Sequence, residues 1–567
     1  MKNVLSLKFF LKIFLLFILF IIVCFSCYMV SKSSLAKNNN SALQLDIKKD
    51  ANSKILDVYF VNKSEKADLM IYFIDEKGLK KIKEEANKNK TKTFINEVAT
   101  RLSYEKDFET KNGKSANLGK IDGTKVVVIG LGEDKKNNQN KKEKNIVLDI
   151  QKAGASIANF ISADDKVLEI SNEYANIDDK MLIEAYFGFN QKIYRFSKYL
   201  TNEEKVKKLP KVKKVALVGK EKTSINSNEI KKLIDKRQNQ LLGIFYVREL
   251  GNEPANVLYP ETMANEIKNV FAGVKNAKVK VLNKKDIEKL GMNMLLGVAQ
   301  GSVKEPKVVV VEYLGNPKSK KYDLALIGKG VCFDSGGLSL KPSQYMEGMK
   351  GDMIGAATIL SSTLSMAKNN VKANIVAVAG LVENMPDGNA QKVGDIVKSM
   401  SGKTVEIIDT DAEGRLVLGD ILYYTQKTYK PEYMIDMATL TGAIMVALGL
   451  ERAGIFTNND DLGNVLKKSG ERTGDRCWIM PIGEEYADAM KSNIADLRNL
   501  SSVRYAGSGT AAAFLENFID DNKKWAHIDI AGVDNATKNN AFGIADFVSG
   551  FGVKLINDFV ENEIESK

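Results

Sequence analysis

The chain has 567 residues, of which 44% are hydrophobic and 27% charged, and this balance excludes a largely disordered protein. Its 83 Lys and Arg against 71 Asp and Glu give a net charge of 83 − 71 = +12, which would suit an anionic partner. However, basic residues gather in Asn-rich runs such as 135–144, which are typical of solvated loops. The single histidine, His527, excludes a zinc site built from two or three histidines.

Residues 1–36 form a distinct N-terminal segment. Three lysines precede an uncharged apolar run, Ile13–Val30, which is just long enough for a membrane span. A small-x-small pattern ending at Ala36 equally permits a cleaved signal peptide, while lipidation of Cys27 and a buried core helix are weaker alternatives. We therefore expect an exported or membrane-anchored protein, associated with the membrane through residues 9–30, whose basic end stays on the cytoplasmic side.

The apolar pattern of residues 37–225 predicts a smaller N-terminal α/β domain. Gly130-x-Gly132 follows one of its strand-like runs but lacks the third glycine of a dinucleotide-binding fingerprint, so no catalytic chemistry is evident here. The apolar periodicity predicts strands at 55–61, 68–74, 125–132 and 211–219, and a helix at 145–162.

The sequence pattern of residues 226–567 predicts a larger C-terminal catalytic α/β domain. Strand-like runs alternate with helical stretches such as 353–368 and 551–562, which indicates a mixed, mainly parallel central sheet flanked by helices. Ligands in such sheets bind at the carboxyl ends of the strands. The strand-like runs are VVVVEYLG, DLALIGKG, ANIVAVAGL, YMIDMATLTGA and WAHIDIAG.

Three polar clusters follow strand-like runs of this domain. Acids buried next to apolar strand ends would be costly if they were left unpaired, so something must neutralise them. With only one histidine in the chain, oxygen-rich coordination of divalent cations is the simplest answer, and it would give a two-metal hydrolytic site. The clusters are Lys329, Asp334 and Lys341; then Asp352; and then Asp409, Asp411, Glu413 and Arg415.

Each cluster also has a purely structural alternative. Asp352 could be a helix N-terminal carboxylate, and Gly336-Gly337 could be an ordinary turn. Residues 409–420 partly match a calcium loop with Asp420 at the twelfth position, but the fifth position is Glu and the preceding TVEII is strand-like. Because these alternatives do not explain three acidic turns in one apolar domain, we favour the metal site.

DTDAEGRL (409–416) resembles the NTDAEGR signature of the leucyl, or cytosol, aminopeptidase family. The resemblance extends over residues 240–555 through ELGNEPANVLYP, GKGVCFDSGGLSLK, MKGDMIGAA, DMATLTGA, WAHIDIAG and SGFGV. It implies a metal-dependent aminopeptidase that acts on peptides. Asp409 stands where the family usually has Asn, from which we expect a local change in charge and no loss of activity. The family is usually cytoplasmic, at odds with the N-terminal segment.

The resemblance also implies roles for the site residues. Two divalent cations, manganese or zinc, would activate a bridging water. A lysine ligand has to be neutral, which a nearby dication permits by lowering its pKa. Lys341 would stay charged and face the substrate carbonyl, and Arg415 would hold a bicarbonate that serves as general base. Lys329, Asp334, Asp352 and Glu413 would hold the tighter ion, and Asp334, Asp411 and Glu413 the more exchangeable one.

A substrate pocket and an assembly are implied in the same way. Met349 and the turn Thr439, Leu440, Thr441, Gly442 and Ala443 resemble the lining of the family's pocket for the N-terminal side chain, which favours leucine-like residues; ordinary core packing is the alternative. The family forms homohexamers of two trimers. We interpret His527 as a structural histidine in a buried strand.

Two further classes of function stay open from the sequence. A nucleic-acid-binding protein could use the charge of +12, although no aromatic-interleaved basic motif or helix-turn-helix supports it. An inactive, membrane-tethered scaffold would need damaged metal ligands, and none of the five is damaged.

Overall fold

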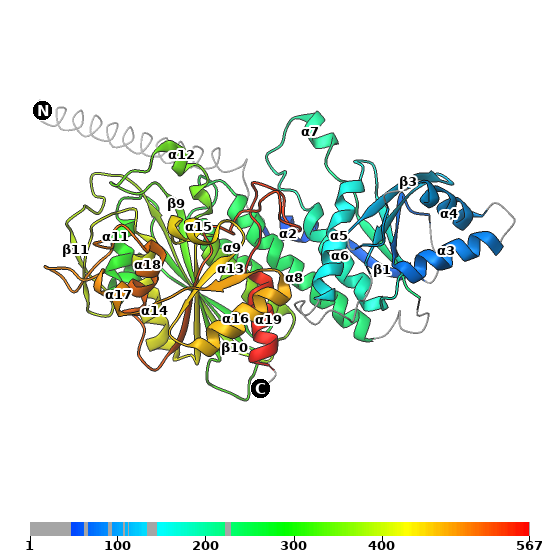
Figure 1. Cartoon of the computed structure of the whole chain (residues 1–567). Coiled ribbons are helices and arrows are strands. Elements are labelled where there is room, and N and C mark those ends of the chain that lie inside the picture. The colour runs from blue at the N-terminus through cyan, green and yellow to red at the C-terminus, as the bar shows by residue number, and fades with distance from the viewer. Residues whose placement is uncertain are drawn as a thin grey trace, which may run out of the picture. The chain divides into compact units, whose positions relative to one another are not determined.

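The computed structural model (Figure 1) describes residues 47–61, 66–88, 93–105, 108–111, 113–132, 145–220 and 228–565. The described residues belong to one compact unit, which contains a smaller N-terminal and a larger C-terminal α/β part. The apolar run Ile13–Val30 and the basic run 135–144 lie outside the described residues, so both interpretations stay predictions. In the part of the chain that is described, no helix has the length and apolar character needed to cross a membrane.

The N-terminal part is built on a six-stranded sheet. Its strands are β1 (Asp57–Val61), β2 (Leu69–Ile74), β3 (Ser115–Ile121), β4 (Thr124–Gly130), β5 (Val167–Tyr174) and β6 (Lys214–Val218). The spatial order is β1-β6-β5-β2-β4-β3, and every neighbouring pair is parallel except β3 with β4. The predicted strands are therefore present, with shorter bounds.

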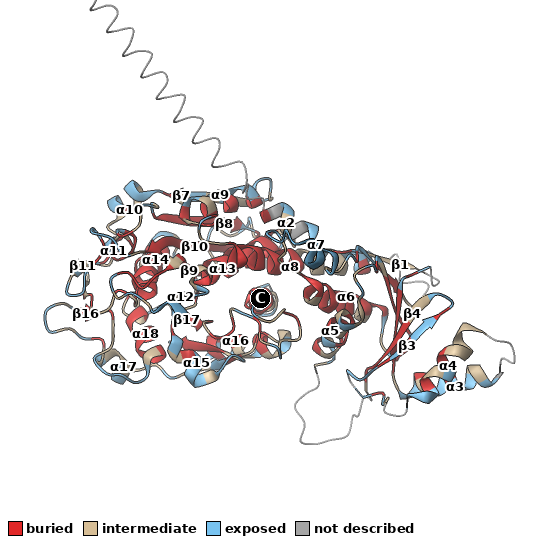
Figure 2. Ribbon diagram, turned by 90° about the horizontal axis from the view of Figure 1, so that it is seen from above, coloured by how far each residue is buried: buried red, intermediate tan, exposed pale blue. Residues whose placement is uncertain are grey.

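Helices cover both faces of this sheet (Figure 2). On one face, Ile82 of α3 and Val98 of α4 pack on β2 and β4. On the other, α6 packs on β5 and β6 beside α5. The predicted helix 145–162 is split into α5 and a 3-10 helix, η1. The bounds are α2 (Ile47–Ser53), α3 (Glu76–Lys88), α4 (Phe94–Tyr104), α5 (Ile146–Ser156), η1 (Ile157–Phe160), α6 (Asp179–Ile193) and α7 (Glu203–Lys207).

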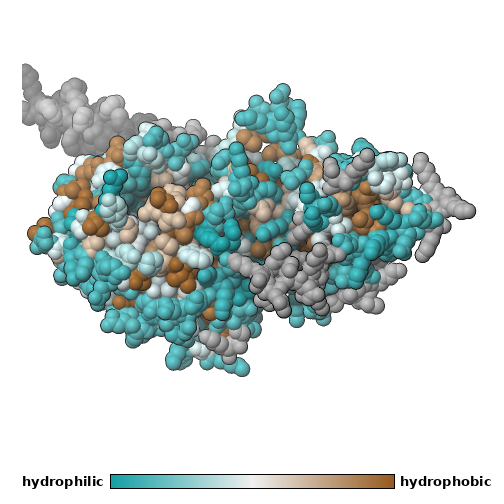
Figure 3. Space-filling model, in the orientation of Figure 1, coloured by the Kyte–Doolittle hydropathy of each residue, from teal (hydrophilic) through white to brown (hydrophobic). Residues whose placement is uncertain are grey.

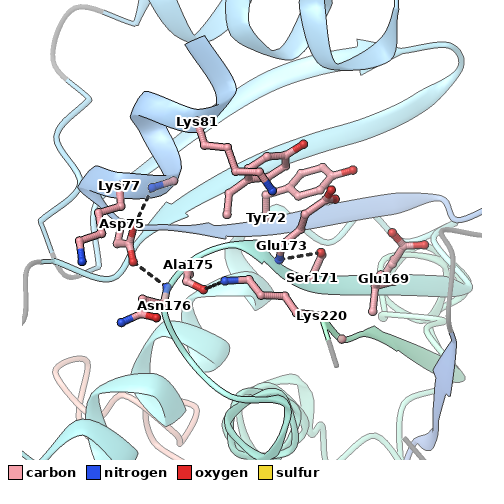
Figure 4. Close-up of a pocket in the computed structure, with 14 residues that line it drawn as sticks. Tyr72, Asp75, Lys77, Lys81, Glu169, Ser171, Glu173, Ala175, Asn176 and Lys220 are labelled. Carbon is pink, nitrogen blue, oxygen red and sulfur yellow. Dashed lines mark hydrogen bonds between the residues drawn. The ribbon is translucent and has the colours of Figure 1, made fainter. Parts of the chain in front are cut away.

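A pocket opens at the carboxyl ends of β2, β5 and β6 (Figure 4). Asp75 joins the first turn of α3 to the loop after β5, because its carboxylate accepts hydrogen bonds from the backbone N–H of Gly78, at 2.7 Å, and of Asn176, at 2.6 Å. The ammonium of Lys81 lies 5.1 Å from the ring centre of Tyr174. None of the predicted site residues lines this pocket.

The C-terminal part contains the predicted mixed sheet, which has eight strands. Its strands are β7 (Ala277–Leu282), β8 (Lys307–Leu314), β9 (Leu324–Asp334), β10 (Asn374–Asn384), β13 (Tyr433–Ala438), β14 (Ala453–Thr457), β15 (Cys477–Ile479) and β17 (Lys524–Asp529). The order is β15-β14-β17-β13-β9-β10-β8-β7, and β17, β13, β9 and β10 form a parallel centre. All residues of β10 are buried, which explains its continuous apolar pattern.

Helices again lie on both faces of the sheet. α13 packs on β9 and β10 and contacts α8 and α19. α14 packs on the same two strands and contacts α11 and α18. The bounds are α8 (Asn228–Asn252), α9 (Pro260–Phe271), α10 (Lys284–Leu290), α11 (Asn293–Ala299), α12 (Ser343–Met346), η2 (Met349–Gly351), α13 (Ile354–Lys368), α14 (Gly414–Tyr429), α15 (Gly442–Leu448), α16 (Asp460–Thr473), α17 (Glu484–Asp488), α18 (Gly507–Glu516) and α19 (Val553–Glu563). A three-stranded sheet is formed by β11 (Ile396–Lys398), β12 (Thr404–Glu406) and β16 (Leu497–Arg498).

The predicted elements of this part agree with the structure apart from one run. The strand-like run 433–443 ends as a strand at Ala438, and α15 begins at Gly442 because the Thr441 side chain accepts a hydrogen bond from the backbone N–H of Ile444. The predicted domain boundary at residues 225 and 226 stays a prediction. The face of the molecule in Figure 3 is mainly hydrophilic, with hydrophobic side chains in several small groups.

Candidate metal centre and active site

The predicted acids and lysines meet at the carboxyl end of the central parallel strands. β9 contributes Lys329 and Asp334, and Asp352 lies between η2 and α13. Asp411 and Glu413 lie in the loop before α14. This loop follows β12, so the third cluster follows a strand as predicted, although β12 belongs to the three-stranded sheet and not to the central one. The loop nevertheless returns its carboxylates to the other two clusters.

Lys329 lies between two of the acids. Its Nζ is 2.8 Å from Asp352 Oδ1 and 2.8 Å from Glu413 Oε1, and it donates to the carbonyl of Thr439 at 3.0 Å. Its side chain is only 3% exposed. Gly414 permits this approach, since a Cβ there would lie 2.7 Å from Lys329 Nζ. The first turn of α14 therefore packs directly against the side chain of Lys329.

Lys341 lies between the other two acids. Its Nζ is 2.9 Å from Asp334 Oδ2 and also contacts Asp411 Oδ1. The other oxygen of Asp334 accepts hydrogen bonds from the Gly336 backbone N–H, at 2.9 Å, and from Asn384 Nδ2, at 2.8 Å. Each lysine therefore bridges a different pair of carboxylates.

The cluster carries excess negative charge when all its members are ionised, because four carboxylates and two ammonium groups give 2 − 4 = −2. Burial raises the pKa of Asp352 well above its ordinary value, and it raises that of Glu413 to about 7. Burial would lower the pKa of Lys329, but the carboxylates of Asp352 and Glu413 outweigh it and raise that pKa.

The donor set fits divalent cations. Oxygens of Asp334, Asp411 and Glu413 lie within 4.8 Å of one another. Asp352 Oδ2 and Glu413 Oε2 are buried and accept no hydrogen bond from any described residue. Buried carboxylate oxygens without partners are costly, and coordination of a cation removes that cost. The residues present therefore suit the metal chemistry predicted from the sequence.

Arg415 is buried beside this cluster at the start of α14. Burial lowers the pKa of its guanidinium to about 10, although the acid groups Glu413, Asp529 and Asp409 oppose the shift. Its Nε and Nη1 have no hydrogen-bond partner among the described residues. Two unpartnered donors on a buried cation suit a small oxyanion.

The calcium-loop alternative is not supported by the geometry. Asp420 is fully buried in α14, and its carboxylate accepts hydrogen bonds from the backbone N–H of Leu295, at 3.1 Å, and of Met400, at 2.8 Å. The strand β12, and not a helix, precedes the loop. Asp409, the residue that departs from the family signature, accepts a hydrogen bond from the Asp411 backbone N–H at 2.9 Å.

Of the predicted pocket residues, Thr439 has a direct contact with the cluster. Met349 opens η2, which packs on β9, and Thr439 donates its hydroxyl to Asp352 Oδ1 at 2.8 Å. Leu440 is half-buried against the core and Thr441 caps α15, so both also have structural roles. Gly442 is exposed and Ala443 half-buried. His527 is fully buried, as its structural interpretation requires, with Nδ1 2.6 Å from Asp436 Oδ1.

The sequence analysis missed three polar residues that brace the site. Asn384 holds Asp334 and also donates to the carbonyl of Thr410 at 3.0 Å. Asn499 donates to the carbonyl of Asp409 at 2.6 Å. Asp529 accepts hydrogen bonds from the turn after β13. The available signal was a polar residue at the end of a buried strand, which holds for Asn384 and Asp529.

An α/β domain with a buried carboxylate–lysine cluster at its strand ends is the architecture of a metal-dependent hydrolase. Residues 245–557 match the cytosol aminopeptidase family, catalytic domain (Peptidase M17), and the chain belongs to this family. It is a metallo-aminopeptidase, as the resemblance of its motifs predicted.

Relatives of known sequence extend the match beyond the catalytic domain. The chain is 40% identical over 444 residues to a probable cytosol aminopeptidase of Rickettsia bellii (strain OSU 85-389), covering 78% of this chain and 85% of the relative. It is 40% identical over 485 residues to a probable cytosol aminopeptidase of Rhodopseudomonas palustris (strain ATCC BAA-98 / CGA009), covering 84% and 93%.

Solved structures share the architecture. A mutant of tomato leucine aminopeptidase superposes with a TM-score of 0.75 at 27% identity, covering 89% of this chain and 96% of the other. The bottromycin maturation enzyme BotP in complex with Mn superposes with a TM-score of 0.73 at 25% identity, covering 87% and 99%. The two-domain α/β fold predicted from the sequence is confirmed.

Proposed function

We propose that this aminopeptidase removes leucine and similar apolar residues from the N-termini of peptides with two divalent cations. The observation that carries the proposal is the pair of buried carboxylate oxygens, on Asp352 and Glu413, that accept no hydrogen bond from the described residues. They belong to a cluster with excess negative charge, and a scaffold that had lost its metals would gain nothing from keeping them.

The contacts support a division of the ligands between two ions. Asp352 and Glu413 already contact the same Lys329 Nζ, as neighbouring ligands of one ion would. Asp334, Asp411 and Glu413 have converging oxygens, as ligands of the other would. Asp334 and Glu413 would be shared. Manganese and zinc both suit such a set.

The catalytic roles follow from charge and position. The cations, when bound, would lower the pKa of a coordinated water and polarise the scissile carbonyl. Lys341, whose side chain is 15% exposed, would present its charge to the negative oxygen that develops on the substrate. Arg415 would hold a bicarbonate through Nε and Nη1, and the bicarbonate would accept the proton of the attacking water.

Preference for leucine rests on the pocket residues. Met349 and the turn 439–443 offer methyl, methylene and thioether groups beside the metal ligands, and the turn contacts Lys329 and Asp352 directly. An apolar pocket selects by buried area, and each additional methylene is worth about 1–3 kcal/mol. Homohexamers of two trimers and export of the chain stay predictions.

The test is metal analysis of the full chain together with hydrolysis of leucyl amide. Dialysis against a chelator should abolish hydrolysis, and manganese or zinc should restore it. Leucyl amide should be cleaved faster than glycyl amide, and N-acetyl-leucyl amide should resist cleavage because its amine is blocked. Full activity in metal-free protein would refute the two-metal proposal, and equal rates on all three substrates would refute the proposed substrate class.

A further inference from the structure

The turn between β13 and α15 is joined to two of the proposed metal ligands. The carbonyl of Thr439 accepts a hydrogen bond from Lys329, and the hydroxyl of Thr439 donates to Asp352. The turn belongs to neither the strand nor the helix, because β13 ends at Ala438 and α15 begins at Gly442. Regular backbone pairing therefore does not hold Thr439 in place.

Asp529 holds this turn from the neighbouring strand. Its Oδ1 accepts hydrogen bonds from the backbone N–H of Leu440, at 3.1 Å, and of Thr441, at 3.4 Å. Its Oδ2 accepts the hydroxyl of Thr441 at 2.6 Å. Asp529 is the last residue of β17 and is fully buried. These donors offset the cost of burying the carboxylate.

A second buried aspartate ties β17 to β13. Asp436 of β13 lies opposite His527 in the parallel pairing, with its Oδ1 2.6 Å from His527 Nδ1. Its Oδ2 accepts the indole N–H of Trp525 at 2.8 Å. All three side chains are fully buried. Trp525, His527 and Asp529 alternate along β17, so they point to the same side of the sheet.

We propose that Asp529 is a positioning residue of the active site. It fixes the 439–441 turn, and the turn fixes Lys329 and Asp352; the Asp436–His527–Trp525 contacts hold the strand that carries Asp529. Asp529 hydrogen-bonds to Leu440 and Thr441 and to neither proposed ligand, so its effect on Lys329 and Asp352 passes through the turn that contains Thr439. The proposal deepens the proposed function and rests on it only where Lys329 and Asp352 are taken to bind a cation.

The central variant is Asp529→Asn in the full chain. An amide keeps the size of the carboxylate but has one acceptor oxygen in place of two, so the turn loses at least one of its three bonds. Loss of a group that orients metal ligands typically costs about 10–100-fold in metal affinity or activity. We expect a loss in this range in manganese affinity, measured by equilibrium dialysis, and a fall in kcat larger than the change in KM.

The matched control is Asp475→Asn. Asp475 is also buried and also accepts backbone hydrogen bonds, from Gly552 at 3.0 Å and Leu555 at 3.4 Å, but it does not contact the turn. This variant should lose thermal stability while its manganese affinity stays within about twofold of the parent. Equal losses of affinity in the two variants would reduce Asp529 to a general stabilising residue and overturn the proposal.

A second pair of variants covers the case in which Asp529→Asn does not fold. Thr441→Val removes the hydroxyl that Asp529 accepts, whereas Thr441→Ser keeps it. The valine variant should lose manganese affinity and kcat, and the serine variant should retain most of both. Parent-like affinity and kcat in the valine variant would refute the positioning role.

Amide hydrogen exchange separates this proposal from the proposed function. Exchange at Leu440 and Thr441 should accelerate in Asp529→Asn and Thr441→Val, and not in Asp475→Asn, whether or not a cation binds. A parent chain that binds neither manganese nor zinc would refute the proposed function, while this exchange pattern would still support the hold on the turn. Unchanged exchange in every variant would refute the hold itself.

Discussion

Two groups of three carboxylates in the described residues bring their oxygens within 4.8 Å of one another. One is Asp334, Asp411 and Glu413, which we call the catalytic cluster. The other is Asp50, Glu249 and Glu253, which we call the Lys198 cluster, because Lys198 lies within it. Proximity alone does not distinguish the two.

The Lys198 cluster supplies its own partners. Lys198 Nζ lies 2.7 Å from Glu253 Oε1 and 3.6 Å from Asp50 Oδ2. The hydroxyl of Tyr199 donates to Glu253 at 2.5 Å, and that of Tyr194 donates to Glu249 at 2.9 Å. Each acid therefore has an ammonium or a phenol beside it.

The catalytic cluster differs because buried carboxylate oxygens in and beside it have no hydrogen-bond partner among the described residues. Glu413 Oε2, and Asp352 Oδ2 next to it, are buried and accept no hydrogen bond, whereas no buried oxygen of the Lys198 cluster is without a partner among the described residues. A cluster of carboxylates is a candidate cation site when some of its buried oxygens have no hydrogen-bond or ion-pair partner. Short distances between the carboxylates are not sufficient.

The largest expected effect is the difference between Asp334→Ala and Glu253→Gln. Asp334 is proposed to be shared by both cations, so its loss should abolish leucyl-amide hydrolysis and lower metal content by more than the 10–100-fold typical of a supporting residue. Glu253→Gln should change stability and leave metal content intact. Metal content and the rate of leucyl-amide hydrolysis are measured for both variants. Comparable metal loss in both would contradict the proposed difference between the two clusters.

The next largest effect is a difference between the two lysines that contact the catalytic cluster. Lys341→Ala should lower kcat by about 100–1,000-fold with little change in metal content, because its charge is assigned to the developing oxyanion. Lys329→Ala should instead lower metal occupancy, because it removes a proposed ligand. Metal counts alongside kcat decide the assignment, and a metal-free Lys341→Ala protein would reverse it.

A smaller effect is expected at the signature position that departs from the family. Asp409 accepts the backbone N–H of Asp411, and an asparagine oxygen can accept the same bond. Asp409→Asn should therefore keep activity within about threefold, a shift of under 1 kcal/mol, which is less than a typical net hydrogen bond. Asp409→Ala should lose more than Asp409→Asn, although far less than Asp334→Ala. Equal losses in Asp409→Ala and Asp334→Ala would contradict this ranking.

The smallest effect is a pH dependence in the Lys198 cluster. Burial raises the pKa of Glu249 to about 7 from an ordinary value of 4.5, although the Tyr194 hydroxyl opposes the shift. The folded state therefore binds the proton more tightly than the unfolded state, so this group's stabilising contribution is present below about pH 4.5 and is lost as the pH rises to about 7.

Glu249→Gln removes that titration and can still accept the Tyr194 hydroxyl. The Tm of the variant minus that of the parent should increase between about pH 4.5 and 7 and level off above. Thermal melts of both proteins across this range measure the difference. A constant difference would show that Glu249 has the same pKa in both states.

Much of the fold was predictable from local pattern. The central strands are buried on both faces, so β9 and β10 appear as continuous apolar runs, and the chemistry-bearing residues adjoin them. The turn at 439–443 was expected from the family resemblance, but the helix α15 that begins at Gly442 was not predicted, because the apolar residues of 433–443 suit either element and only the Thr441 cap marks the break.

The sequence by itself determined the kind of site. The acids, the lysines and the DTDAEGRL motif lie in short contiguous segments, and their chemistry follows from their residue types. Only the tertiary structure decided which side chains contact one another. Lys329 contacts Glu413 across 84 positions (413 − 329), and Asp529 holds Thr441 across 88. Such partners are set by strand order and packing, which no short stretch of sequence encodes. The same acidic composition therefore gives a candidate cation site in one place and a neutralised cluster in another.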